Sequence, residues 1–191
     1  MGRSSRASVT PATAASDPRF PELSLPIPPP FPVMEATRAA RLPEGHDWQF
    51  EPKWDGFRCL VFRAGDSVAL QSKAGQPLSR YFPELVEAVR RSPHESFVLD
   101  GEIVIFRDGH LSFDDLLLRI HPARSRIETL AKATPAAFIV FDLLYDSDAG
   151  PPELLNRPLA ERRERLEGFV RTGGGNPSIY LSPAARDREI A

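Results

Sequence analysis

A lysine, a carboxylate and an arginine lie close together between residues 51 and 58 of this 191-residue chain. Lys53 follows Glu51 by two residues and precedes Arg58 by five, with Asp55-Gly56 between them. A lysine amine attacks phosphorus or carbonyl carbon only when it is unprotonated, so a site that uses one lowers its pKa by burial or by nearby positive charge. Arg58 can supply that charge and hold a phosphate, and Gly56 permits a close backbone approach or a positive φ. The segment therefore suits a lysine nucleophile.

The same residues also suit a plain hairpin turn, because Asp-Gly is a frequent turn pair. The spacing within this segment alone favours the turn over the nucleophile. Three segments further along the chain reverse that preference when they are taken in order. They are Arg80-Tyr81-Phe82-Pro83-Glu84-Leu85, Leu99-Asp100-Gly101-Glu102-Ile103-Val104 and Phe138-Ile139-Val140-Phe141-Asp142-Leu143-Leu144.

Together with these three segments, Lys53-Trp54-Asp55-Gly56-Phe57-Arg58 resembles the KxDGxR motif of a nucleotidyltransferase family. The family includes ATP-dependent DNA ligases, RNA ligases and mRNA capping enzymes. The order of the segments is similar to that of bacterial ATP-dependent DNA ligases, and the short ligases associated with end joining are the nearest likeness. The resemblance runs from about residue 26 to residue 191.

The resemblance implies a role for each matching residue. Lys53 would attack the α-phosphate of ATP and become lysyl-AMP. Glu51 would accept a hydrogen bond from the adenine amino group, and Arg58 would hold the phosphate and ribose side of the nucleotide. Glu102 would contact ribose or a metal ion, and Phe141 would stack on adenine. The implied cofactors are ATP and Mg²⁺, and the AMP would then pass to the 5′-phosphate of nicked double-stranded DNA.

Some of these assignments have an ordinary structural alternative. Asp100-Gly101 also suits a hairpin turn that would leave Glu102 on a solvent face. Phe141 lies in an apolar run, where most aromatic side chains belong to the core. Each alternative is preferred when its segment is taken singly, and the functional assignment is preferred when the segments are taken in series with Lys53.

One segment departs from the family pattern. Where the family has Ser-Arg, this chain has Ser72-Lys73. Lys73 keeps a positive charge at this nucleotide-binding position, but it lacks the planar guanidinium that binds a phosphate through two hydrogen bonds. We therefore expect a weaker contact with the nucleotide or the nick phosphate at Lys73.

The C-terminal residues 179–191 resemble the stretch that precedes the family's next motif, a Glu-Gly pair. A Lys-x-Lys motif and an OB-fold domain also follow in the family. We therefore expect residues 26–191 to be a partial adenylation domain, truncated at its C-terminus, after a disordered Pro/Ser/Ala-rich tail over residues 1–25. We do not expect full nick sealing by this chain alone. A nucleotidyltransferase for RNA ends or caps and an inactive remnant that only folds or binds nucleotide stay open as alternatives.

Composition agrees with a soluble domain, since 41% of residues are hydrophobic and 26% are charged. The net charge of −2 gives no general attraction for nucleic acid, so DNA contacts must come from a local patch. Cys59 is the one cysteine and cannot form an internal disulfide. No apolar run reaches membrane length, so we expect a cytoplasmic protein without membrane contact. The resemblance implies DNA repair or end-joining proteins as possible partners.

Residue patterns predict an α+β fold in which antiparallel sheets are flanked by helices. The resemblance implies more narrowly a nucleotidyltransferase (ATP-grasp-like) adenylation domain. The charged run 161–165 is expected on a solvated helix face. The predicted strands cover residues 48–53, 57–63, 67–72, 97–106, 136–145 and 178–181, and the predicted helices cover 81–91, a stretch after Ser112, 123–132 and a stretch from 158 through 169.

Overall fold

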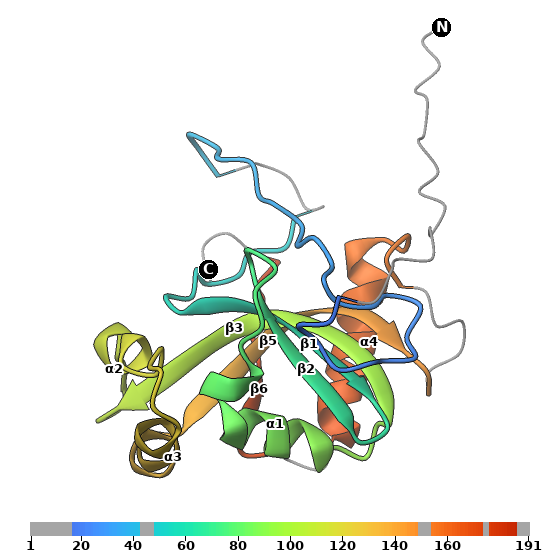
Figure 1. The fold of residues 1–191 in the computed structure, drawn as a ribbon. Coiled ribbons are helices and arrows are strands. Elements are labelled where there is room, and N and C mark those ends of the chain that lie inside the picture. The colour runs from blue at the N-terminus through green and yellow to red at the C-terminus, as the bar shows by residue number, and fades with distance from the viewer. Residues whose placement is uncertain (1–16, 43–47, 149–153, 174–175, 187–191) are drawn as a thin grey trace, which may run out of the picture.

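The computed structural model describes residues 17–42, 48–148, 154–173 and 176–186 (Figure 1). Its elements are β1 (Phe57–Ala64), β2 (Ser67–Ser72), the 3₁₀ helix η1 (Ser79–Tyr81), α1 (Pro83–Arg90), β3 (Ser96–Arg107), β4 (His110–Leu111), α2 (Phe113–Leu117), α3 (Arg124–Ala133), β5 (Ala136–Asp146), α4 (Leu159–Thr172) and β6 (Ile179–Leu181). One sheet has the strand order β2-β1-β3-β5-β6, and the short β4 pairs with the end of β3.

The predicted class of antiparallel strands with helices outside is confirmed in outline. The sheet is mostly antiparallel, but its last pair, β5 with β6, is parallel. The strands that the sequence assigned to several sheets belong to this one sheet. A parallel pair needs a long crossover connection, and α4 lies in the connection from β5 to β6.

The strand predicted over residues 48–53 is wrong. Within that stretch only Phe50 makes a β-bridge, with Ala185, through hydrogen bonds of 2.8 and 2.9 Å. Pro52 lacks a backbone N–H, so the segment cannot continue a ladder as a regular strand. Residues 51–55 instead run as irregular chain into β1. Of the predicted strands 48–53, 57–63 and 67–72, only the last two form, and they make the hairpin β1–β2.

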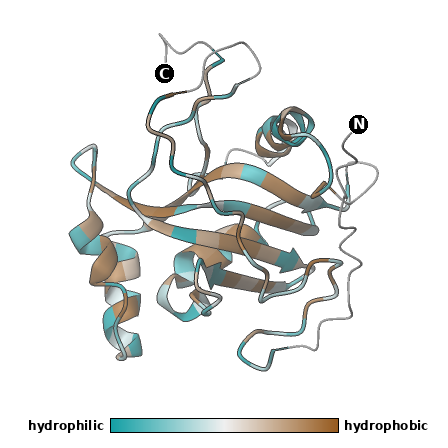
Figure 2. Ribbon diagram, turned by 90° about the horizontal axis from the view of Figure 1, so that it is seen from above, coloured by the Kyte–Doolittle hydropathy of each residue, from teal (hydrophilic) through white to brown (hydrophobic). Residues whose placement is uncertain are grey.

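Two apolar clusters lie on opposite faces of the sheet, because successive strand residues point to opposite sides. Cys59 and Val61 join the larger cluster, to which α1 and α4 also contribute. Leu60 and Phe62 join a second cluster, which the N-terminal segment covers. Figure 1 shows that segment and α1 on opposite sides of the sheet, and Figure 2 shows the strands as mainly hydrophobic. Cys59 is buried, and this burial raises the pKa of its thiol.

The N-terminal segment packs along the sheet as extended chain. Phe20, Leu23 and Ile27 are buried against it. The side-chain amide of Gln71 on β2 donates to the carbonyl of Phe31 at 2.6 Å and accepts its N–H at 2.8 Å. The disordered tail predicted over residues 1–25 thus includes two buried side chains, and residues 1–16 of it lie outside the described residues.

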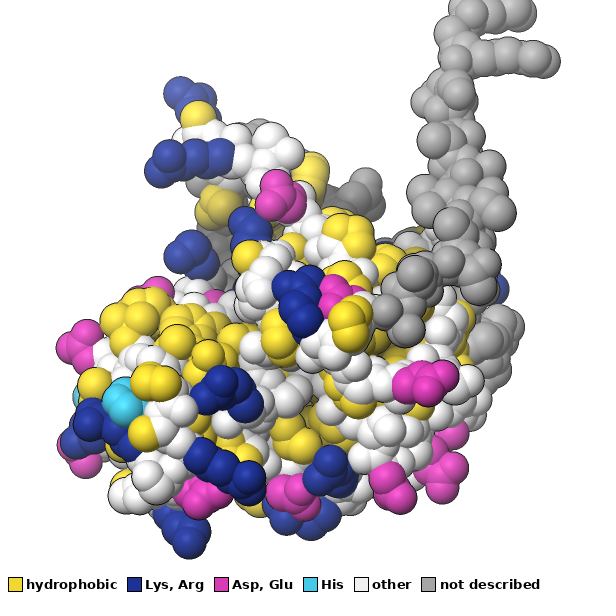
Figure 3. All heavy atoms as spheres, viewed as in Figure 1, with side chains coloured by type: hydrophobic (Ala, Val, Ile, Leu, Met, Phe, Trp, Pro, Cys, Tyr) yellow, Lys and Arg dark blue, Asp and Glu magenta, His cyan; other side chains and the backbone are white. Residues whose placement is uncertain are grey.

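Helices α2 and α3 lie together at one end of the sheet (Figure 1). Ser112 caps α2 as expected, since its hydroxyl accepts the N–H of Asp115 at 3.3 Å. The space-filling view shows hydrophobic side chains gathered over this end (Figure 3). Those exposed side chains are Phe106, Leu111, Phe113, Leu117, Leu118 and Ile120. In the part of the chain that the structure describes, no helix combines the length and the hydropathy that a membrane crossing needs.

Candidate functional site

Lys53 lies in the irregular segment that leads into β1, and its side chain is exposed. The next residue anchors this segment to the sheet. The indole N–H of Trp54 donates to the hydroxyl of Ser182 at 3.0 Å. Its ring packs on three side chains of β3 and β5, namely Val104, Ala137 and Ile139. The half-buried Trp54 therefore fixes where the chain presents the Lys53 amine.

Gly56 allows the chain to approach β3 closely. A Cβ at this position would collide with the carbonyl oxygen of Ile103 and would lie 2.8 Å from Cγ of Glu102. The φ of Gly56 is not positive, so close approach and not a left-handed backbone requires the glycine. No strand precedes Asp55 among residues 48–55, so Asp55-Gly56 is not a hairpin turn.

Arg58 is the centre of a polar group on the sheet face that carries the N-terminal segment. Its guanidinium donates two hydrogen bonds of 2.8 Å to the carboxylate of Asp100 on β3. Its Cζ atom lies 4.7 Å from the centroid of the Phe141 ring, over the ring face. Hydrogen bonding to Asp100 raises the pKa of Arg58, and burial raises the pKa of Asp100 although Arg58 opposes that change. Arg58 is therefore held over Phe141 by a nearly buried carboxylate.

Glu102 lies directly opposite Arg58 in the pairing of β1 with β3. Burial raises the pKa of Glu102 to about 7, and the neighbouring Asp100 adds to that rise. Arg58, the backbone N–H of Gly56 and the charge of Lys53 act in the opposite direction. This carboxyl group thus lies within the electrostatic reach of Lys53 and Arg58, and it can change its protonation near neutral pH.

A β-bulge in β5 presents Phe141. Asp100 pairs with Asp142 and Gly101 pairs with Val140, so Phe141 has no partner across the strand pair. Such a bulge redirects the side chain of the extra residue. Here the redirected ring meets Arg58 on the polar face of the sheet. Phe141 is half-buried. It therefore does not belong wholly to the core, which was the structural alternative for this residue.

The bulge is braced by helix α4. Arg162 donates to both oxygens of Asp142, at 2.8 and 2.9 Å, and to the carbonyl of Arg157 at 2.7 Å. Both members of the pair are buried. The solvated face predicted over residues 161–165 is therefore wrong for Arg162, and also for Arg163, which is buried and donates to the carbonyl of Ser182 at 2.7 Å.

Lys73 follows β2 next to the same polar group. Its backbone N–H donates to the carbonyl of Arg58 at 3.2 Å. Its exposed amine lies 3.4 Å from the carboxylate of Glu35 in the N-terminal segment. An exposed pair of this kind contributes little to stability, so the Lys73 side chain is available to an anionic ligand.

Glu51 faces a different part of the molecule. Its carboxylate accepts from the amide of Gln49 at 2.6 Å and lies 3.9 Å from a guanidinium nitrogen of Arg163 on α4. No hydrogen bond or ion pair within the described residues joins Glu51 to Arg58, Glu102 or Phe141. Arg58 is thus the residue to which Lys73, Glu102 and Phe141 are joined, Lys53 lies within the electrostatic reach of Glu102, and Glu51 lies beside α4.

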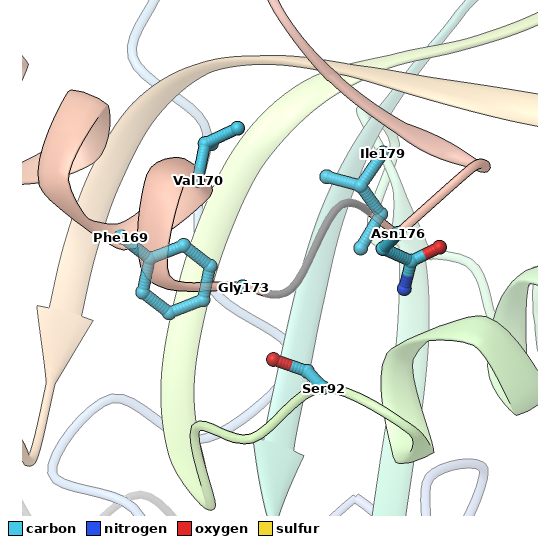
Figure 4. A pocket seen from close by; sticks show the side chains of 6 residues that line it. All are labelled: Ser92, Phe169, Val170, Gly173, Asn176 and Ile179. Atoms are coloured by element: carbon cyan, nitrogen blue, oxygen red, sulfur yellow. The ribbon is translucent and has the colours of Figure 1, made fainter.

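Two hollows in the surface are formed by described residues. The first, of about 40 Å³, is lined by residues that include Ser92, Phe169 and Ile179 (Figure 4), and it is too small for a nucleotide. The second, of about 350 Å³, is lined in part by Gln49 and Arg163, the two contacts of Glu51. None of the six predicted site residues lines either hollow.

Sequence reasoning gave no role to Asp100, Asp142 or Arg162. Strand alternation held a signal for Asp100, because residues 100 and 102 of one strand share a face. No sequence signal revealed the pair of Asp142 with Arg162, because it joins two elements 20 residues apart through a bulge. Asp100 orients Arg58, and the pair of Asp142 with Arg162 braces the bulge that presents Phe141.

Residues 33–189 match the protein family described as the ATP dependent DNA ligase domain. The chain is 45% identical over 169 residues to DNA ligase C2 of Mycolicibacterium smegmatis and 44% identical over 171 residues to DNA ligase C of Mycobacterium tuberculosis. Each comparison covers 88% of this chain and 46% of the relative. The chain thus spans about half the length of these curated relatives.

Two solved structures have a similar fold. A mycobacterial DNA ligase D complexed with ATP and MES superposes with a TM-score of 0.52 at 27% identity, over 71% of this chain and 39% of that one. The ligase domain of LigD from M. tuberculosis gives a TM-score of 0.51 at 28% identity, over 72% and 39%.

Proposed function

The chain belongs to the ATP-dependent DNA ligase family, and from this premise we propose that Lys53 takes up AMP from ATP as the first step in joining nicked double-stranded DNA. The observation that carries the proposal is the arrangement of charge around this lysine. Lys53 precedes a strand on which Arg58 stands, and Glu102 faces Arg58 from the next strand. The carboxyl group of Glu102 thus lies within the electrostatic reach of one amine, Lys53, and one guanidinium, Arg58.

In the proposed reaction, Nζ of Lys53 loses a proton and attacks the α-phosphorus of ATP. A P–N bond forms, the bond from the α-phosphorus to the bridging oxygen of the β-phosphate breaks, and pyrophosphate leaves. Exposure of Lys53 leaves the amine open to a ligand that arrives from solvent. The AMP group would next pass to a 5′-phosphate at a nick, where the 3′-hydroxyl displaces it.

Arg58 and Lys73 would bind the phosphates. They are adjacent through the backbone hydrogen bond of 3.2 Å, so the two cations can act on one anionic group. Arg58 keeps its charge beside Asp100, and part of its guanidinium remains exposed to solvent. Lys73 would add a single point of attraction in place of a bidentate contact.

Phe141 would support the adenine. In this structure Arg58 already covers one face of the Phe141 ring. Stacking of a base on this ring therefore requires the opposite face or the edge, or a shift of the guanidinium. Glu51 would accept a hydrogen bond from the adenine amino group. It would do so from its position beside Arg163 and Gln49. We propose both roles on the strength of the family segments.

Glu102 would help to hold Mg²⁺. A carboxylate that lies beside the phosphate-binding cations fits a hard divalent ion, which prefers oxygen ligands. The bound ion would neutralise charge on the phosphates. Because Glu102 has a pKa of about 7, it would have to lose a proton before it binds the ion at neutral pH.

The test follows the AMP group. The chain is incubated with ATP labelled at the α-phosphate and Mg²⁺, and then with a nicked DNA duplex or a matched nicked RNA duplex. We expect label first on the protein and then on the 5′-end of the nicked DNA. With Lys53→Arg we expect neither labelled protein nor labelled DNA. Transfer of the label to RNA in preference to DNA would favour an enzyme that acts on RNA ends. Label that stays on the protein would mean that the chain takes up AMP but does not transfer it to a nucleic acid.

A further inference from the structure

A second group of potential ligand atoms lies at the far end of the sheet from Glu102. His94 belongs to the connection between α1 and β3, Asp146 ends β5, and Asp148 follows two residues later. Their side-chain ligand atoms all lie within 4.8 Å of one another. Asp146 pairs with Phe97, five residues along β3 from Glu102, which corresponds to about 17 Å. The group is therefore separate from the nucleotide site.

Helix α4 fixes the orientation of the His94 ring. The ring stacks on Phe169 with centroids 4.0 Å apart and planes 19° apart. Its Nε2 atom lies 3.0 Å from the hydroxyl oxygen of Thr172 and 3.2 Å from the carbonyl oxygen of Phe169. That hydroxyl itself donates to the carbonyl of Gly168 at 2.9 Å. The carbonyl of Phe169 can only accept, and the Thr172 hydroxyl accepts when it donates to Gly168, so this geometry fits a hydrogen on Nε2.

The other ring nitrogen then faces an oxygen. Nδ1 lies 3.2 Å from Oδ2 of Asp148. When Nε2 carries the only ring hydrogen, Nδ1 holds a lone pair, and a lone pair opposite a carboxylate is repulsive unless a cation lies between them. Asp146 adds a nearly buried carboxylate to the same place, and its Oδ1 accepts the N–H of Asp148 at 3.0 Å. The group therefore needs positive charge.

We propose that His94, Asp146 and Asp148 bind one divalent transition-metal ion, Zn²⁺, through Nδ1 and two carboxylate oxygens. Two ligand atoms that are each about 2.0–2.2 Å from a tetrahedral Zn²⁺ lie about 3.3–3.6 Å apart. The separation of 3.2 Å between Nδ1 and Oδ2 of Asp148 is close to that range. One imidazole and two carboxylates suit zinc better than the all-oxygen sets of Mg²⁺ and Ca²⁺.

The ion would join three parts of the fold. It would connect the end of β5 to the chain before β3, and through the His94 ring it would reach the last turn of α4. Figure 4 shows Phe169 on this turn beside Gly173. A cation whose ligands come from two separate segments stabilises the folded state by its binding free energy. The proposed site is therefore structural and lies outside the ligase chemistry.

Cobalt and heat report on the site without any ligase reaction. The purified chain, without nucleotide, is titrated with Co²⁺ while visible absorption is recorded, and its Tm is measured with EDTA and with Zn²⁺. We expect one Co²⁺ per chain, with the spectrum of a tetrahedral site, and a higher Tm with Zn²⁺. Asp148→Asn, which keeps the side-chain shape, should weaken Co²⁺ binding at least about tenfold and remove the Zn²⁺-dependent rise in Tm.

His110→Ala and Asp114→Asn are matched controls, because both residues are exposed and lie outside the group. Both variants should respond to the metals as the parent does. The proposal is overturned if the parent shows no tetrahedral Co²⁺ spectrum and no change of Tm with Zn²⁺. It is also overturned if Asp148→Asn keeps the full response.

Discussion

Glu102 is the residue whose ionisation most directly connects the fold with the proposed chemistry. It stands opposite Arg58 and within the electrostatic reach of Lys53, and burial raises its pKa to about 7. A carboxyl group of this kind is half protonated at neutral pH. Metal binding at Glu102, and with it the uptake of AMP, should therefore become stronger as the pH rises through 7.

The raised pKa also predicts how stability depends on pH. The folded chain keeps the Glu102 proton up to about pH 7, whereas the unfolded chain loses it near pH 4.5. The folded state binds more protons between these values, so the contribution of Glu102 to the free energy of unfolding falls from pH 4.5 to 7 and then stays constant. Glu102→Gln removes this loss. We therefore compare the free energy of unfolding of the variant with that of the parent at each pH. This difference should favour the variant by about 1 kcal/mol more at pH 8 than at pH 4.5, a value that allows for the partial exposure of Glu102.

Urea unfolding of both proteins at the two pH values measures this difference. Glu128→Gln, an exposed glutamate on α3, serves as the control and should show no comparable change. Equal differences between parent and Glu102→Gln at both pH values would contradict the assignment of a raised pKa to Glu102.

At the scale of elements, the bulge in β5 depends on its contact with α4. Arg162→Met leaves the buried carboxylate of Asp142 without a cation, which should lower the free energy of unfolding by about 3–5 kcal/mol. Arg171→Met changes an exposed arginine of the same helix and should stay within about 0.5 kcal/mol of the parent. Chemical denaturation measures both. If the two variants lost similar stability, the pair would not be what holds the bulge.

Gly101 allows β3 and β5 to meet beside the bulge. A Cβ there would lie 2.5 Å from the carbonyl oxygen of Ile139 and 2.5 Å from the ring of Phe138. Gly101→Ala should therefore cost about 1–3 kcal/mol through overpacking. Gly168→Ala is a matched control, because its Cβ would meet nothing within 4 Å on α4, and helix propensity should stabilise it by about 0.5–1 kcal/mol. Thermal unfolding should thus shift in opposite directions, and a shift in the same direction would contradict the close approach.

At the scale of the whole molecule, the N-terminal segment completes one face of the sheet. Ile27 is 4% exposed and packs in the cluster that contains Leu60 and Phe62. Ile27→Ala should lower the free energy of unfolding by about 2–4 kcal/mol. Met34→Ala, at an exposed position of the same segment, should have almost no effect. Similar values for both variants in urea would mean that the segment does not pack on the sheet in solution.

Much of the fold could be predicted from local pattern. The apolar run of β5, the cap at Ser112 and the turn at Asp108-Gly109 each carry their own signal, and all three occur in the structure. The proline-rich composition predicts extended chain that lies on the body from about residue 21, but without periodicity it does not indicate which side chains, such as Phe20 and Leu23, become buried. Arg162 was missed for a similar reason, since its buried partner lies on another element.

The arrangement of the predicted site residues could be foreseen only in part. Arg58 and Glu102 face each other because strand pairing joins segments that the family pattern keeps in order. The ring of Phe141 reaches Arg58 only through the bulge, which no periodicity indicates. Glu51 shows the limit of spacing as a guide. It is two residues from Lys53 in the sequence, yet its carboxylate contacts Arg163 on α4.

We propose Lys53 as the residue that takes up AMP. This role can be tested sharply because the chain has only three lysines, Lys53, Lys73 and Lys132. The intact mass of the chain is measured after incubation with ATP and Mg²⁺, followed by peptide mapping, for the parent and for the lysine-to-arginine variant at each position. We predict one adenylate per chain, located on Lys53, absent from Lys53→Arg and present in the other two variants. An adduct that persists in Lys53→Arg, or a parent that gains none, would contradict the account.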